Sequence, residues 1–166
     1  MRPSRFLALV LLLALAACNG SSRSGRSLPS EPEAGPVVFE TLVQRSIPGQ
    51  SGGEVREVAR DAAAWASLWA RLREGAGATL PEAPPAVDFS REMVIAAAME
   101  TQGCVSRVTI QSILQRRGEL VVDLLEAPPA PNCVCVTSER PLHAVRLPLS
   151  ADPVRFEVTR GQTTCG

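Results

Sequence analysis

The chain has 166 residues, a length typical of one domain, and its 17 basic residues, all arginine, balance 17 acidic ones. This zero net charge argues against a nucleic-acid-binding protein, which should carry a basic face. A hydrophobic share of 45% is too high for a disordered chain. A single histidine excludes most histidine-based catalysis and histidine-rich metal sites, and no cofactor motif is found, so we expect neither metal nor cofactor.

The first 17 residues have the pattern of a bacterial lipoprotein signal peptide. A basic start precedes the apolar run 6–17, which is too short to be a permanent membrane span and is typical of a secretory signal. Residues 15–18, Leu-Ala-Ala-Cys, resemble the lipobox, which implies cleavage before Cys18 and acylation of that cysteine. Several acyl chains would then hold the protein on the membrane. By analogy with known lipoprotein sorting, Asn19 favours the outer membrane; the alternative is an ordinary secretory signal with a chance cysteine.

The next segment has the composition of a tether. Residues 18–36 combine the lipidated cysteine with a stretch rich in Gly, Ser and Pro. Such a stretch cannot bury enough apolar surface to offset its ordering entropy, so we expect it to be disordered. Its expected end-to-end reach is roughly 23 Å. The pattern changes at Val37, and we assign residues 37–166 to one folded domain.

Short apolar or alternating segments within that domain predict six or seven strands. The run Met-Val-Ile-Ala-Ala-Ala-Met at 93–99 is continuously apolar, which predicts a central, buried strand. The dipeptide Arg117-Gly118 suits a tight hairpin between two of the strands. Eight segments are strand candidates, of which six or seven are expected to form strands: 39–44, 54–59, 93–99, 105–114, 119–125, 133–137, 142–147 and 154–159.

One amphipathic helix is predicted over 61–75, with Asp61 as its N-cap and Gly75 just past its C-terminus. Its apolar face repeats at i, i+3, i+4 and i+7 and consists of Trp65, Leu68, Trp69 and Leu72. We expect this face to pack on a sheet; the alternative is an exposed tryptophan patch. Together the elements predict a single α+β domain, with a mostly antiparallel sheet of six or seven strands and one main helix.

Four cysteines remain after Cys18, and an even number outside the cytoplasm predicts disulfides. Cys133 and Cys135 lie two residues apart on a predicted strand, where a bridge between them would be strained. Two pairings stay open: Cys104–Cys133 with Cys135–Cys165, or Cys104–Cys135 with Cys133–Cys165. A redox pair and a zinc site are less favoured alternatives, because no helix N-terminus and no C-x₂₋₄-C spacing accompany these cysteines.

A hydrolase motif is also present. Residues 49–53, Gly-Gln-Ser-Gly-Gly, match G-x-S-x-G around Ser51, and either Asp88 or Asp123 with His143 could complete a triad. The motif needs a helix directly after the serine, whereas two glycines and a strand-like segment follow here. A glycine-rich turn therefore explains the motif better, and we expect His143 to be a packed or surface residue.

Three segments of the domain resemble the C-terminal domain of PrcB-like proteins, a family named for a component of a bacterial surface protease complex. They are the acidic-capped helix with its Leu-Trp motif at 61–72, the segment containing Val-Asp-Phe at 84–96, and Pro-Leu-His-Ala-Val within 141–148. The resemblance covers about residues 37–150. Where that family has a Thr-Gly-Gly-Tyr turn, this chain has Thr101, Gln102, Gly103 and Cys104, so only the threonine and one glycine match.

The resemblance implies a non-catalytic lipoprotein domain, with assembly or stabilisation of an exported protease as a known theme. Our leading hypothesis is therefore a lipid-anchored module that binds an exported protein, such as a protease, through its surface. A protease inhibitor is the second hypothesis, with the loops at 100–104 and 127–132 as candidate contact segments. The third is a serine hydrolase using Ser51, and a purely structural envelope lipoprotein is a further alternative.

Overall fold

The computed structural model describes residues 35–48, 52–74, 76 and 79–165. The predicted signal peptide, Cys18, almost all of the predicted tether and Ser51 lie outside the described residues.

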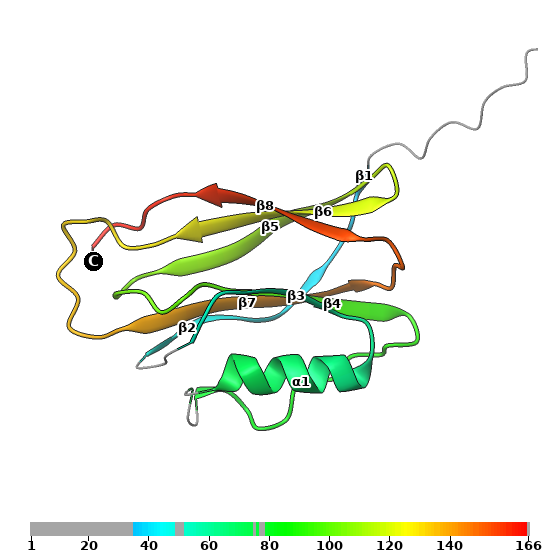
Figure 1. The fold of residues 1–166 in the computed structure, drawn as a ribbon, viewed down its shortest axis with the longest axis horizontal. Helices are drawn as coiled ribbons and strands as arrows, with labels where there is room; N and C mark the ends of the chain where they lie inside the picture. The colour runs from blue at the N-terminus through cyan, green and yellow to red at the C-terminus, as the bar shows by residue number, and fades with distance from the viewer. Residues whose placement is uncertain (1–34, 49–51, 75, 77–78, 166) are drawn as a thin grey trace, which may run out of the picture. The chain divides into compact units, whose positions relative to one another are not determined.

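The described chain forms a single, mostly β domain with two four-stranded sheets and one helix, where sequence analysis expected one sheet (Figure 1). The first sheet has the order β1-β5-β6-β8, with bounds Gly35–Pro36, Arg107–Arg116, Glu119–Ala127 and Val154–Arg160. The second has the order β2-β7-β4-β3, with bounds Glu40–Pro48, Glu139–Pro148, Glu92–Ala98 and Val55–Ala59. Neighbouring strands are antiparallel except for β6 and β8, which are parallel.

The domain has three layers: the two sheets pack face to face, and helix α1 (Ala62–Arg73) covers the other face of the second sheet (Figure 1). One buried cluster lies between the sheets and another lies beneath the helix. Strand β4 contributes to both, because Met93 and Ile95 face the first sheet whereas Val94 and Ala96 face α1. Burial on both faces explains why this strand is continuously apolar in an antiparallel sheet.

Helix α1 begins where the sequence predicts it to begin. The Asp61 carboxylate accepts a hydrogen bond from the backbone N–H of Ala64 at 2.7 Å, which satisfies one of the unpaired donors of the first turn. The tryptophan indoles donate to the loop that follows the helix, Trp65 to the carbonyl of Pro85 and Trp69 to that of Pro81. All four residues of the predicted apolar face are buried: Trp65, Leu68, Trp69 and Leu72.

We expect the substitution Asp61→Ala to lower the free energy of unfolding by about 1 kcal/mol, because it leaves the N–H of Ala64 without its side-chain acceptor. Urea unfolding followed by tryptophan fluorescence measures the change. Asp61→Asn keeps an acceptor at the same position and serves as the matched control. Equal unfolding midpoints for the alanine and asparagine variants would contradict the assigned cap.

The β5–β6 hairpin turns at Arg117 and Gly118, whose φ angles of +47° and +77° are the positive values that a two-residue hairpin turn needs. The predicted tight turn is therefore found at this dipeptide.

Two other expectations need correction, and the direction of the last strand is a detail that the sequence does not predict. Residues 133–137 were expected to form a strand, but they lie outside both sheets. Gly35 and Pro36, assigned to the end of the tether, form the short strand β1 against β5. The last strand, β8, joins β6 in parallel, because the chain crosses from the second sheet to the first before reaching it.

Candidate functional site: a loop held by two disulfides

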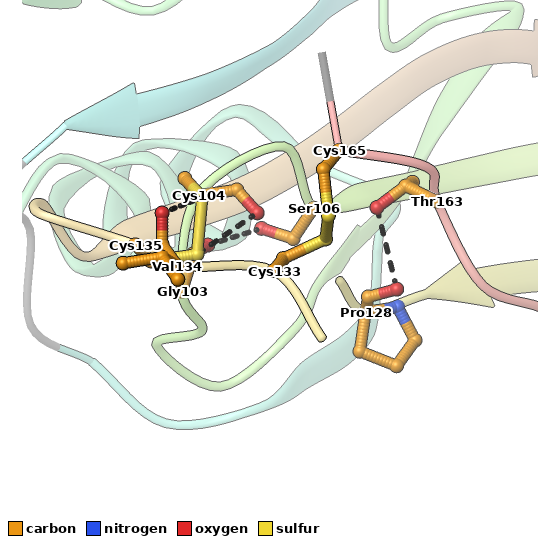
Figure 2. The surroundings of a disulfide bond; sticks show 9 residues. All are labelled: Gly103, Cys104, Ser106, Pro128, Cys133, Val134, Cys135, Thr163 and Cys165. Carbon is orange, nitrogen blue, oxygen red and sulfur yellow. Dashed lines mark hydrogen bonds between the residues drawn. A yellow bond between two sulfur atoms is a disulfide. The ribbon is translucent and has the colours of Figure 1, made fainter. Parts of the chain in front are cut away.

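Three segments far apart in the sequence meet at one end of the sheets. They are the link between β4 and β5 (99–106), the link between β6 and β7 (128–138) and the tail that follows β8 (161–165). Two disulfides join them, Cys104–Cys135 and Cys133–Cys165 (Figure 2). These bonds select one of the two pairings that the sequence left open. All four cysteines are therefore engaged, which leaves no free thiol among them for the alternative redox or zinc roles.

The tail is positioned by backbone contacts before it reaches its cysteine. The Thr163 N–H donates to the carbonyl of Pro128 at 2.9 Å, and the Ala130 N–H donates to the carbonyl of Thr163 at 3.1 Å. The Thr163 hydroxyl also donates to the Pro128 carbonyl, at 3.4 Å (Figure 2). These bonds lay the tail beside the link between β6 and β7. As a result Cys165 lies within bonding distance of Cys133.

The turn residues singled out by the family resemblance form the other side of this corner. Gln102 pairs with Glu139 through two backbone hydrogen bonds, at 2.8 and 2.9 Å. The Thr101 hydroxyl accepts a hydrogen bond from the Gly52 N–H at 3.1 Å. A Cβ at Gly103 would lie 2.8 Å from the Cys135 sulfur, so only glycine fits against the Cys104–Cys135 bridge. Thr101, Gln102 and Gly103 thus position this disulfide.

Val105 follows directly after this bridge and has a φ of +54°. A β-branched residue rarely adopts this left-handed region, because its side chain crowds the backbone there. Such strain persists only where the surrounding structure enforces it, and it concentrates at functional sites. The strained residue therefore marks this corner as a candidate site.

We call residues 133–137 the clamped segment. Its side chains alternate: Cys133 and Cys135 are half-buried in the disulfides, whereas Val134 and Val136 are 90% and 94% exposed. Within the described part of the chain, no backbone N–H or C=O of residues 134–137 takes part in a backbone–backbone hydrogen bond. The segment therefore presents two apolar side chains, and backbone groups that neither sheet uses, on a covalently fixed frame.

The sequence does not identify Val134 and Val136 as site residues, because Cys-Val-Cys-Val-Thr has the alternation of a half-buried strand. The available signal was the Pro-rich stretch directly before the segment, which is typical of a loop rather than of a sheet strand. In the structure the inward residues of this alternation, Cys133 and Cys135, are held by their disulfides and do not pack in the core of a sheet.

Of the residues proposed for the hydrolase alternative, Ser51 lies outside the described residues, and neither Asp88 nor Asp123 contacts His143. His143 is buried on β7, where its Nδ1 accepts a hydrogen bond from the Ile110 N–H at 2.8 Å and its Nε2 lies 3.0 Å from the Thr41 hydroxyl. Burial lowers the pKa of His143 to about 4. Among the described residues no carboxylate contacts this imidazole: Asp88 binds Ser90 and Arg91, and Asp123 lies on β6.

The bonds of His143 belong to a contact between the two sheets. Strand β1 is only two residues long, so most of the β5 edge has no neighbouring strand. Side chains of β2 and β7 bind that edge: Gln44 donates to the carbonyl of Val108, Ser46 donates to the carbonyl of Ser106, and His143 accepts from Ile110. A groove of about 670 Å³ runs beside this edge and reaches Val105.

Within the described ranges no group of three or more His, Cys, Asp or Glu side chains is arranged to hold a metal ion. Among the same residues no helix has the length and apolar character needed to cross a membrane. No family model matches the chain, and neither a curated protein nor a solved structure matches it.

Proposed function

We propose that this chain is a non-catalytic, lipid-anchored module that binds an exported protein through the clamped segment. The observation that carries the proposal is the exposure of Val134 and Val136 on a backbone fixed by two disulfides. Of the five large apolar side chains exposed in the described ranges, these two and Val105 lie at the same corner. Clustered exposed apolar residues are a feature of interaction surfaces, whereas scattered ones are ordinary.

The fixed backbone favours binding for a thermodynamic reason. A contact surface that is already ordered loses little conformational entropy when it associates, so more of the contact energy appears as affinity. Few residues carry most of the energy of an interface. Val134 and Val136, two outward valines separated by one residue on a braced segment, suit that role.

The proposed location rests on two independent features. The lipobox-like sequence ending at Cys18 supports export and acylation, with the outer membrane favoured. The disulfides support an oxidising compartment, because such bonds are rare in cytosolic proteins. The segment between Cys18 and the domain would let the bound module reach a partner beside the membrane, and no nucleic-acid partner is proposed.

The resemblance to PrcB-like proteins supports a more specific partner class. In that family the theme is assembly or stabilisation of an exported protease, and we propose an exported protease as the partner here. The segment that carries the Thr-Gly-Gly-Tyr turn in that family is occupied here by Gly103 and the disulfide of Cys104. The contact surface of this chain would therefore be built differently from that of the family.

We expect the double substitution Val134→Asp/Val136→Asp to abolish recovery of the partner when the intact lipoprotein is purified from membranes. Two carboxylates would have to be desolvated in the contact, which is unfavourable without a pairing cation. Val38→Asp is the matched control, because Val38 is 84% exposed and lies in the link between β1 and β2. Recovery of the same exported protein by the double variant, or of none by the unaltered chain, would overturn the proposal.

A further inference from the structure

We propose that the clamped segment is read as an extended substrate strand by an exported protease with a small aliphatic primary pocket, and that Val134 enters this pocket. This inference rests on the proposed function, since it names the chemistry of the partner. The chain would then act as a tight-binding, slowly cleaved inhibitor.

The backbone of the segment has what strand-type recognition requires. Recognition of an extended peptide uses main-chain hydrogen bonds for affinity and pockets at alternate side chains for specificity. Residues 134–137 make no backbone–backbone hydrogen bond within the described ranges, so neither sheet uses their N–H and C=O groups. The Val134 carbonyl lies 4.0 Å from the Cys104 sulfur (Figure 2). The chain is free of turns and bends from Cys133 to Cys135 and bends at Val136 and Thr137, so the outward side chain of Val134 is the one that such a pocket would take.

The position of the disulfides favours a protease over other strand-binding partners. The peptide bond between Val134 and Cys135 lies between two half-cystines that are bonded to different parts of the domain. Hydrolysis of this bond would consume one water and leave a carboxylate on Val134 and an amine on Cys135. Both new ends would stay tied to the domain, through the bridges to Cys165 and Cys104. The cleaved ends could not diffuse apart, so the complex would persist and the bond could re-form.

The side chain of Val134 selects the protease class. An uncharged, β-branched residue does not pair with the carboxylate that some proteases carry at the base of the primary pocket, and it does not fill a deep aromatic slot. A small aliphatic pocket matches it in size and polarity. The clamped segment follows directly after 127–132, so the proposed contact lies just beyond the loop that the sequence suggested for an inhibitor.

The other suggested loop, 100–104, has a supporting role. Gln102 holds the β7 end of the site through its hydrogen bonds to Glu139, and Cys104 forms a disulfide with Cys135 of the clamped segment. Gly103 leaves the space that the Cys135 sulfur occupies. These residues would hold Val134 in its outward position without touching the protease.

The experiment measures inhibition by the purified oxidised protein against three probes: pancreatic elastase, which prefers small aliphatic residues, trypsin and chymotrypsin. We expect inhibition of elastase alone. Val134→Asp should raise the inhibition constant at least 100-fold, whereas Val38→Asp should leave it unchanged. Val134→Arg should shift inhibition from elastase to trypsin. Unfolding midpoints equal to that of the unaltered chain show that substitutions at these exposed positions have not disturbed the fold.

The outcomes separate this inference from the proposed function. If elastase is unaffected by the oxidised protein, or if Val134→Asp inhibits equally well, the inference is wrong. If inhibition is absent while recovery of an exported partner still depends on Val134 and Val136, the binding function stands and only the protease-cleft assignment falls. Cleavage of the segment followed by rapid loss of the complex would also overturn the inference.

Discussion

Replacing Cys104 and Cys135 together with serine should lower the free energy of unfolding by about 3–4 kcal/mol. The bridge spans a sequence separation of 31 residues, and closing a loop of this length restricts the unfolded chain far more than the native one. Since domains are stable by only about 5–15 kcal/mol, the loss is a large share of the total. Urea unfolding followed by the fluorescence of the buried Trp65 and Trp69 measures it.

The second bridge provides the matched comparison. Cys133→Ser/Cys165→Ser opens a loop of nearly the same length, with a separation of 32 residues, so the chain-entropy argument predicts a similar loss. Removing both bridges should cost less than the sum, because both act on the same link between β6 and β7 and such neighbours are not additive. Unchanged midpoints in either pair would contradict a stabilising role for that bridge.

Acidification from pH 6.5 to 4 should destabilise the fold by up to about 3 kcal/mol through His143 alone. Burial lowers the pKa of His143 to about 4 from its ordinary value of 6.5. Between these two values the unfolded chain binds a proton at this imidazole and the folded chain does not. The stabilisation is therefore complete above pH 6.5 and is lost as the pH falls toward 4. Urea unfolding midpoints measured between pH 6.5 and 4 give the change of stability with pH.

Substitutions of His143 isolate its contribution to the pH dependence of stability. His143→Asn keeps an oxygen acceptor for the Ile110 N–H and cannot take up a proton in this range, so its stability should be nearly independent of pH between 6.5 and 4.5. His143→Phe should be less stable at every pH, because the Ile110 N–H loses its acceptor. Asp88 and Glu157 have lowered carboxyl pKa values, so their contributions disappear only at more acidic pH. A pH slope in the asparagine variant equal to that of the unaltered chain would assign the effect to other groups.

Local elements of this fold could be predicted because their signals lie within a few residues. The helix with Trp65 and Trp69 combines a periodicity with a capping residue, the run at 93–99 is continuously apolar, and the hairpin has a turn dipeptide at Arg117-Gly118. The arrangement of the strands could not be predicted. An apolar strand has the same sequence pattern whether its second face meets a helix or another sheet, so one sheet and two sheets were indistinguishable.

The candidate site was harder to predict because its signal depends on partners distant in the sequence. The spacing of Cys133 and Cys135 excluded one pairing, but choosing between the other two required the positions of the tail and of Cys104 in space. The exposure of Val134 could not be predicted for the same reason. The same alternation within a sheet would have one face buried, and only the positions of the disulfide partners show that this segment lies outside the sheets. Nothing near Val105 indicated its positive φ, which arises where the chain leaves the disulfide to begin β5.

Strand β4 has a consequence for how the domain denatures. Its neighbouring residues Val94 and Ile95 belong to different buried clusters, so unfolding of the strand would remove buried side chains from both clusters. Without β4, neither the cluster beneath α1 nor the cluster between the two sheets would be complete. Melting should therefore be one all-or-none event, with fluorescence from the tryptophan side and circular dichroism from the sheets changing in step.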